Sequence, residues 1–387
     1  MKIKCLKILL LCLIIISCGE NEPLQNDVKL SVVNVLKRES SNFNYIKSFR
    51  IENGTAKGNN VLIFPSWDKY FETIDKLDEM VDKDCDAFDS TIQNTQYDQY
   101  RINKTSKSLA LNISDDEYDE LANEAGFDED NVLLKFEDDL KFTSLRKKIA
   151  INEENWLALQ GDDVWNGNLD PDNHFIDDET ERTLLSENSE VVIGDDKIGY
   201  VYYKLLDGYG GMVQVHNSDL EAITQVSNGF IPKNNSNVVI VTREIQAPDI
   251  DCKRELKEVE YEIYGSNRIK RKSKVRNNDW WGYKKISAVT IGYKKKNGKW
   301  KRRRTTITAG VTDINGTGAG FIYNDCSTKF EVMEVKEKHR RKVKVKINGA
   351  RFNGGSLIIG IKDNNVYSFH KQDGLNVKKD YYDMPKY

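Results

Sequence analysis

Residues 61–83, VLIFPSWDKYFETIDKLDEMVDK, join a short apolar run to an amphipathic segment. The first four residues are typical of a buried strand. After Pro65, apolar residues recur near the helical period, and Ser66 supplies the side-chain oxygen that a helix needs at its N-cap. We therefore predict a strand leading into a helix, whose apolar stripe lies in the core and comprises Trp67, Phe71, Ile74, Leu77 and Val81.

The same reasoning extends along the chain. Helical spacing predicts short helices at 114–125 and 153–159, and apolar runs around a turn predict strands at 190–195 and 198–205. From Asn237 onward, short alternating segments are separated by NG, GG, DNN and GTGAG, which is typical of an antiparallel sandwich or barrel. We predict the α+β class, with a mixed α/β region followed by a mainly antiparallel β region.

Length and composition suit more than one domain. The chain has 387 residues, of which 39% are hydrophobic and 31% are charged. This length corresponds to two or three domains. We place a signal peptide at 1–17, a lipid-anchored tether at 18–55, an acidic α/β domain at 56–235 and a basic all-β domain at 236–387.

The first 18 residues, MKIKCLKILLLCLIIISC, combine a lysine-bearing start with an apolar run from Ile8 to Ile16. The run is too short to span a bilayer and is typical of an export signal. Residues 15–18, IISC, resemble the lipobox of bacterial lipoproteins, which implies that Cys18 carries a lipid. We expect a protein tethered to the cell envelope, at the outer membrane, on a face that the sequence leaves open. An ordinary signal peptide with an incidental cysteine and a short membrane anchor are the alternatives.

Three segments follow one another in a recurrent order. They are VLIFPSWDKYFETIDKL at 61–77, LKFTSLRKKI at 140–149 and DPDNHFIDDETERTLLSENSEVVIGDDKIGYVYY at 170–203. This order resembles uncharacterised cell-envelope lipoproteins of Bacteroidota, in which an F-x-SLR segment precedes a helix-to-strand element LLN-x-x-x-EV-x-IGD. Ser186 stands where those chains have Asn. The resemblance covers residues 58–206 and implies the compartment, but no activity and no functional residue.

Charge is segregated along the chain. Residues 1–240, the acidic part, hold 24 Lys/Arg and 44 Asp/Glu, whereas residues 241–387, the basic part, hold 34 and 17. The formal net charge of −3 therefore conceals a strongly dipolar molecule. Eight cations fall within residues 294–304 alone.

Those cations flank Asn297-Gly298, a strong signal for a two-residue hairpin turn. On one hairpin face we predict three opposed pairs: Trp300 with Lys295, Arg302 with Tyr293, and Arg304 with Ile291. The other face brings together Lys299 with Lys296, Lys301 with Lys294, and Arg303 with Gly292. Like charges directly opposed destabilise a hairpin.

A second basic segment, HRRKVKVKI at 339–347, alternates with the period of a strand. Lys342, Lys344 and Lys346 share one face, which we expect to face water, and the apolar residues share the other. A third cluster, NRIKRKSKVR at 267–276, precedes Trp280 and Trp281. If these segments share a sheet, their cations form one surface.

Three explanations compete for this surface. Lysines on an exposed strand solubilise the protein and discourage edge pairing. Alternatively, the basic part docks on the acidic part, with attraction screened beyond about 8 Å. The third explanation is an external polyanion such as an acidic polysaccharide, lipid head groups or extracellular nucleic acid. Genomic DNA is a poor partner because the expected location is the envelope and no nucleic-acid-binding motif is present.

We predict a binding or scaffold protein without catalysis and without a cofactor. The proposed polyanion-binding residues are Lys294, Lys296, Lys299, Trp300, Lys301, Arg302, Arg303, Arg304, Lys342, Lys344 and Lys346, with Trp300 and Tyr293 as stacking partners. One alternative is a structural surface protein whose charges serve intramolecular docking. The other is a hydrolase with unrecognised carboxylates, although HExxH, GxSxG and GxxxxGK[ST] are absent from the sequence.

Cysteines and a calcium-like loop complete the candidates. Cys252 and Cys326 bracket the basic hairpin and are the favoured disulfide pair, with three unpaired thiols, including Cys85, as the alternative. In LDPDNHFIDDETE at 169–181, ligand-type residues stand at calcium-loop positions, namely Asp170, Asp172, His174, Asp178 and Glu181. Phe175 occupies the position that requires glycine. We therefore predict a capped helix start there and no metal site.

Overall fold

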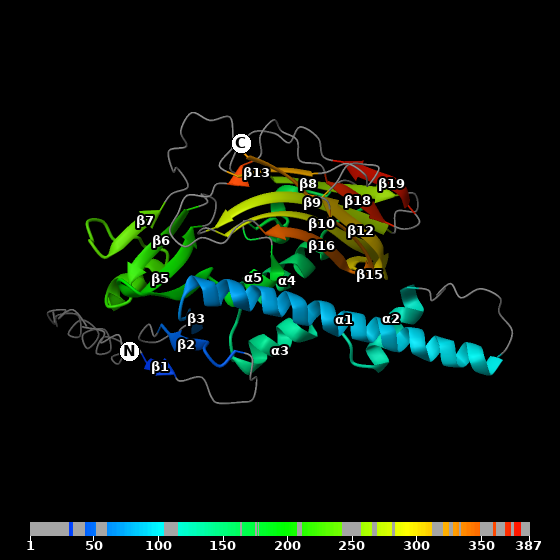
Figure 1. Cartoon of the computed structure of the whole chain (residues 1–387), viewed down its shortest axis with the longest axis horizontal. Helices are drawn as coiled ribbons and strands as arrows, with labels where there is room; N and C mark the ends of the chain where they lie inside the picture. Colours follow the sequence, from blue (N-terminus) through cyan, green and yellow to red (C-terminus); the bar gives the residue numbers. More distant parts are fainter. Residues whose placement is uncertain are drawn as a thin grey trace, which may run out of the picture.

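The computed structural model confirms the α+β class. It describes residues 31–33, 43–51, 60–103, 115–162, 165–174, 176, 178–206, 211–241, 257–264, 269–280, 283–311, 320–324, 328–332, 334–348, 359–360, 368–372 and 375–380. Figure 1 shows the long helix α1 (Trp67–Asn103) beneath a stack of C-terminal strands, with an N-terminal sheet at one end. None of the described helices is long and apolar enough to cross a membrane.

The N-terminal sheet has seven strands in sequence order. They are β1 (Ser31–Val33), β2 (Lys47–Arg50), β3 (Asn60–Phe64), β4 (Glu190–Asp195), β5 (Gly199–Leu206), β6 (Gly211–His216) and β7 (Val238–Val241). Each strand is antiparallel to its neighbours except for the parallel pair β3 and β4. Parallel neighbours need a crossover connection. Here helices α1 to α5 supply it, so the helical layer is a long insertion between two adjacent strands.

The predicted strand-to-helix element is confirmed. β3 runs into α1, and Ser66 Oγ accepts a hydrogen bond from the backbone N–H of Lys69 at 3.3 Å. Phe71, Ile74 and Leu77 are buried in one cluster with apolar residues of β3, β4 and β5. The N-terminal half of α1 is thus fixed on the sheet by the apolar stripe.

The other helices are α2 (Asp115–Glu124), α3 (Asn131–Asp139), α4 (Leu145–Ala158), α5 (Glu179–Leu184) and α6 (Leu220–Ser227), with short 3₁₀ turns η1 (Gly167–Leu169) and η2 (Pro171–Asn173). α2 matches the helix predicted at 114–125, and the helix predicted at 153–159 is the end of α4. Ser144 caps α4 by accepting from the Lys147 N–H at 3.1 Å. The cap side chain also donates to Glu137, which forms a buried 2.7 Å pair with Arg146.

The remaining strands form three sheets in which every pair is antiparallel. One contains β8 (Lys257–Tyr264), β9 (Ile269–Trp280), β10 (Tyr283–Lys296), β11 (Lys299–Arg302) and β16 (Lys342–Asn348). A second contains β12 (Thr305–Val311), β15 (Glu334–Arg340), β18 (Phe369–Gln372) and β19 (Leu375–Asp380). The third contains β13 (Gly320–Asn324), β14 (Thr328–Val332) and β17 (Ile359–Gly360). The predicted antiparallel character is confirmed.

Two of these sheets meet through small buried side chains. Thr290 on β10 donates to the Thr308 carbonyl on β12 at 2.7 Å, and both threonines are buried. His370 on β18 contacts the same Thr290 hydroxyl through Nδ1 at 2.8 Å. The sheet that carries the basic hairpin therefore has β12 and β18 on one side and, as shown below, the helical layer on the other.

Two expectations need correction. Residues 238–241 were expected in the all-β region, but β7 pairs with β6, so the first sheet extends beyond the boundary at 235. The predicted strand at 339–347 is interrupted at Arg341, where the chain leaves β15 in one sheet and enters β16 in another. Alternation does not show the break, because residues 336–342 on both sides of it are all polar.

Candidate charged interface and cationic hairpin

The hairpin β10–β11 has the predicted turn. Asn297 and Gly298 have φ of 52° and 76°, the left-handed conformation that a type I′ turn requires of both central residues. The register pairs Tyr293 with Arg302, Lys294 with Lys301, Lys295 with Trp300, and Lys296 with Lys299, as predicted. The pairing expected between Arg304 and Ile291 is wrong, because β11 ends at Arg302 and Ile291 pairs with Lys272 and Lys342.

The two rings expected to stack on a ligand lie instead in a buried cluster. Trp300 is 2% exposed and Tyr293 is 0% exposed. They pack with Trp156, Leu157 and Trp165 of the helical layer. Trp300 Nε1 donates to the Gly161 carbonyl at 3.0 Å. The stacking role is therefore corrected: these rings join the basic sheet to α4, and neither face is open to a ligand.

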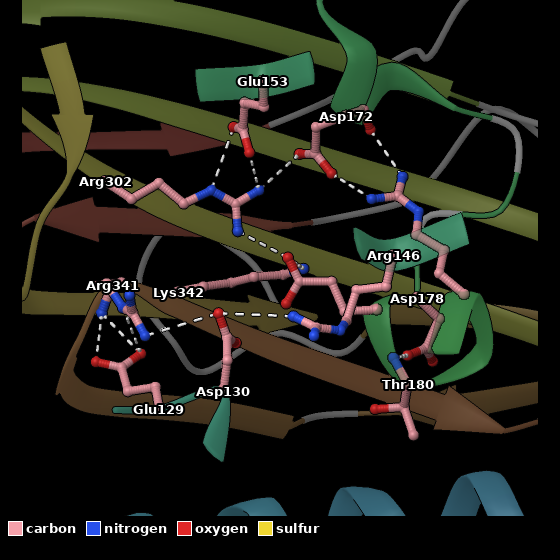
Figure 2. A network of polar contacts seen from close by, with 12 residues as sticks. Glu129, Asp130, Arg146, Glu153, Asp172, Asp178, Thr180, Arg302, Arg341 and Lys342 are labelled. Atoms are coloured by element: carbon pink, nitrogen blue, oxygen red, sulfur yellow. Dashed lines mark hydrogen bonds and ion pairs between the residues drawn. The ribbon is translucent and has the colours of Figure 1, made fainter. Parts of the chain in front are cut away.

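Arg302 lies directly beside this cluster and is surrounded by carboxylates. Its guanidinium is 2.6 Å from Glu153, 2.7 Å from Glu179 and 3.7 Å from Asp172. Figure 2 shows it between Glu153 and Asp172. Glu153 also accepts from the Tyr293 hydroxyl at 2.9 Å. One cation of β11 thus connects α4, η2 and the first turn of α5.

The calcium-like loop is part of this arrangement. Asp172 is fully buried and pairs with Arg182 at 2.6 Å. Asp170 accepts from the Asp172 N–H at 2.9 Å, and Asp178 accepts from the Thr180 N–H at 3.1 Å. The predicted capped start is present as the 3₁₀ turn η2, which has Asp170 as N-cap and Pro171 in its first turn, whereas the α-helix α5 begins later with Asp178 as its N-cap. Among the described residues, no group of three or more His, Cys, Asp or Glu side chains could hold a metal ion.

The lysines of β16 also face carboxylates. Lys342 is 3.1 Å from Glu179, Lys344 is 2.8 Å from Asp178, and Lys346 is 2.7 Å from Asp78 on α1. Their side chains are only 12%, 18% and 9% exposed. The alternation is as predicted, with Val343 and Val345 buried on the other face. The expectation that the lysine face meets water is wrong, because the acidic helices cover it.

The remaining arginines continue the same pattern. Arg304 Nε donates to Glu129 at 2.7 Å, and Arg340 donates to Asp86 at 2.7 Å. Arg303 pairs with Asp119 on α2, Arg341 pairs with Asp128, and Lys295 is 2.7 Å from Asp162. We call this whole set the charged seam; its cations are Lys295, Arg302, Arg303, Arg304, Arg340, Arg341, Lys342, Lys344 and Lys346. A cavity of about 490 Å³ lies along it between α1 and strands β15 and β16.

Ionisation in the seam is fixed by mutual pairing. Burial alone would raise the pKa of Glu179, but Lys342 and Arg302 outweigh it and hold that pKa well below its ordinary value. Burial alone would lower the pKa of Arg302, but Glu153 and Glu179 raise it well above its ordinary value. Both partners are therefore charged across the ordinary pH range, and each depends on the other for compensation.

Three of the four lysines at the hairpin end, Lys294, Lys299 and Lys301, differ from the seam. Lys296, Lys299 and Lys301 are exposed, and Lys294 is partly exposed. Within the described part of the chain, no ion pair joins Lys294, Lys299 or Lys301 to a carboxylate. The register brings Lys294 opposite Lys301 and Lys296 opposite Lys299. We call these four residues the lysine tip.

The sequence did not identify the carboxylates of the seam. Asp78, Glu153 and Glu179 come from three helices, Glu129 comes from the turn before α3, and no shared motif marks them. The available signal was the opposite charge of the two parts of the chain, which favoured intramolecular docking without naming residues. The paired residues are far apart in the sequence: Arg302 and Glu179, for example, are separated by 123 positions.

Several sequence candidates lie outside the described residues. They are Cys18, the proposed lipid site, and Cys252 and Cys326, the proposed disulfide pair. Cys85 is described; it is a free, buried thiol on α1. Burial raises its pKa to about 12, because the opposing effect of the Arg340 charge is smaller. This thiol is therefore protonated and unreactive in the folded protein.

Comparisons with known proteins add little. No protein-family model matches the chain, and no curated protein matches it. A solved structure of a DUF4848 family protein from Bacteroides thetaiotaomicron is similar at 12% identity, over 81% of this chain and 92% of that chain. Its TM-score is 0.17, so this weak neighbour carries no argument about fold or function.

Proposed function

We propose that this protein is a non-catalytic binding or scaffold protein of the cell envelope, tethered by a lipid on Cys18, whose lysine tip holds a polyanion. The ligand class is an acidic polysaccharide or another anionic surface. The observation that carries the proposal is the contrast between the lysine tip and the seam. Every seam cation meets a carboxylate, whereas no ion pair joins Lys294, Lys299 or Lys301 to a carboxylate in the described part of the chain, and their like charges gather at the end of one hairpin.

The cost of this arrangement supports a ligand role. Like charges directly opposed across a hairpin are destabilising, and the tip contains two such pairs, Lys294 with Lys301 and Lys296 with Lys299. An anionic chain lying along the tip relieves this repulsion and releases its own counterions. Flexible lysine side chains suit repeated negative charges better than a single rigid anion. The seam narrows the site to the hairpin end, because the other proposed cations pair with carboxylates of the protein, whereas Lys294, Lys299 and Lys301 form no ion pair in the described part of the chain.

Binding over a salt series tests the proposal. The soluble chain starting after Cys18 is titrated with an acidic glycan, anionic vesicles and single-stranded DNA. Four neutralised phosphates on single-stranded DNA give a slope of about −3 for log K against log salt concentration. Changing Lys294, Lys296, Lys299 and Lys301 to Ser is expected to abolish binding or bring the slope close to zero.

A matched control removes the same charge elsewhere. Lys83, Lys147, Lys197 and Lys233 are exposed lysines of the acidic part, and changing them to Ser leaves the tip intact. The control is expected to bind as the parent does. Equal losses in both variants, or no binding by the parent to any polyanion, would sink the polyanion proposal. The three ligands also separate a glycan from a lipid surface.

The seam favours a second candidate, a structural surface protein whose charges serve intramolecular docking. The specific observation is that cations of β11 and β16 meet carboxylates of α1, α4, η2 and the start of α5 at 2.6 to 3.7 Å. If the lysine tip binds no polyanion while seam variants separate the basic sheet from the helices, the structural function replaces the polyanion-binding function.

A further inference from the structure

α1 has a second cavity on another of its faces. Asp78, Asp82 and Cys85 line the cavity at the charged seam, whereas Leu77, Met80, Asp84 and Phe88 line a cavity of about 660 Å³. The latter lies between α1, α3, the turn before α3 and the segment at Phe43. In Figure 1, α3 lies on the far side of α1 from β15 and β16. This helix cavity has no residue in common with the seam or the lysine tip.

Phenylalanine dominates the apolar lining. The four rings are Phe43, Phe88, Phe127 and Phe136. Phe43 and Phe136 meet edge to face at 5.4 Å, and Phe88 and Phe127 stack at 4.0 Å. Phe88 is partly exposed, so its ring is within reach of a bound molecule, whereas the ring of Phe127 is stacked on Phe88 and already has the Arg304 guanidinium 5.1 Å from its centre. The volume falls in the range of small-molecule sites, which are mostly apolar with a few polar groups.

The charges in the lining favour a cation. Asp84 comes from α1, and Lys135 and Asp139 come from α3. Lys135 and Asp139 are separated by four positions on one helix, so their opposite charges lie close together and offset each other. The lining therefore has a net charge of one negative unit, which is carried by Asp84. This residue is partly exposed, and no ion pair links it to another residue in the described ranges.

Aromatic rings and a carboxylate together define a ligand chemistry. The face of a phenyl ring is electron-rich and attracts a cation within about 6 Å. An adjacent carboxylate adds direct charge attraction, while methyl groups or rings on the ligand occupy the apolar volume. We propose that this cavity is a binding site for a small organic cation, such as a quaternary ammonium or a hydrophobic amine. It is independent of the lysine tip, which takes a ligand of opposite charge.

Calorimetry with two matched probes tests the site on the whole soluble chain starting after Cys18. Benzyltrimethylammonium is the cation, and neopentylbenzene is its neutral counterpart of the same shape. Loss of the charge interaction is expected to weaken binding about tenfold for the neutral probe, within the range of a cation and ring contact plus one carboxylate. Asp84→Asn is expected to weaken cation binding several-fold, and Phe88→Leu is expected to do the same.

The matched control is Asp82→Asn. It removes one charge two positions earlier on α1, in the lining of the other cavity, and is expected to leave cation binding unchanged. Circular dichroism verifies that each variant is folded. Equal affinity for the charged and neutral probes, equal losses in the two aspartate variants, or no binding of the cation would each overturn the proposal.

Discussion

Replacing Arg302 by Met removes the central cation of the seam while keeping an unbranched side chain of similar reach. Its three carboxylate partners are almost closed to water: the side chains of Glu153, Asp172 and Glu179 are 5%, 0% and 22% exposed. Breaking a buried ion pair by removing one partner destabilises proteins by about 3–5 kcal/mol, because the other charge stays buried without compensation. The structure decides where in this range Arg302→Met falls.

Each carboxylate keeps another partner after the change. Asp172 retains Arg182 at 2.6 Å, and Glu179 retains Lys342 at 3.1 Å. Glu153 retains the Tyr293 hydroxyl but loses the one cation that pairs with it in the described part of the chain. The penalty therefore comes mainly from Glu153, and we expect a loss of about 3 kcal/mol in the free energy of unfolding.

A second substitution isolates that cause. In Arg302→Met combined with Glu153→Gln, the orphaned charge is gone and the amide oxygen still accepts from the Tyr293 hydroxyl. We expect the double variant to recover at least about 1 kcal/mol relative to Arg302→Met. A double variant less stable than the single one would mean that desolvation of Glu153 is not the main cost.

Urea unfolding, followed in parallel by tryptophan fluorescence and circular dichroism, measures the effect. Trp156, Trp165 and Trp300 pack beside Arg302 and report on the interface, whereas circular dichroism reports on the whole fold. Non-coincident transitions would show the interface opening first. Lys83→Met is the control, because Lys83 and Glu79 form an exposed pair worth less than about 1 kcal/mol. If Arg302→Met costs no more than Lys83→Met, the seam does not hold the two layers together.

Two further predictions follow from the same contacts. The pKa of Glu179 is lowered on folding, so its contribution to stability is present above the unfolded value of about 4.5 and is lost as the pH falls through the folded value. Urea midpoints measured between pH 6 and pH 3 are expected to fall less steeply in Glu179→Gln than in the parent, and parallel curves would contradict the role of Glu179. Gly194→Ala places a Cβ 2.1 Å from the Pro65 carbonyl oxygen, so we expect a loss of about 2 kcal/mol by chemical denaturation. A loss below about 0.5 kcal/mol would contradict this close approach of β4 to the start of α1.

Local features were accessible from the sequence. The β3–α1 element, the β4–β5 hairpin and the Asn297-Gly298 turn each depend on periodicity or turn chemistry over fewer than about 25 residues. The hairpin register followed from the turn alone and is confirmed at Tyr293 and Arg302. The local sequence determines each of these elements, so they could be predicted without the remaining chain.

The sequence did not show which other parts of the chain pack against those elements. Periodicity separates Lys344 from Val343 and Val345 but does not say what covers the lysine face. That face is covered because two carboxylates that are distant in the sequence pack against it: Asp78 on α1 and Asp178 at the start of α5. The same limit explains Trp300, whose ring meets the end of α4 and is buried there. An amphipathic strand adjacent to water and one adjacent to charged helices have the same alternating pattern.

The seam links the two parts of the chain more closely than their compositions indicate. Asp178 is 1% exposed and pairs with Lys344 and Lys346, so the acidic part contains a buried carboxylate whose compensation comes from the basic part. The basic part contributes Val289, Ile291, Tyr293 and Trp300 to a shared apolar cluster. Neither part is stable at this surface without its partner. The acidic part alone would bury an uncompensated carboxylate, and the basic part alone would expose aromatic rings. The opposite charges of the two parts therefore meet at their interface, and Lys294, Lys299 and Lys301 are the hairpin cations that have no carboxylate partner among the described residues.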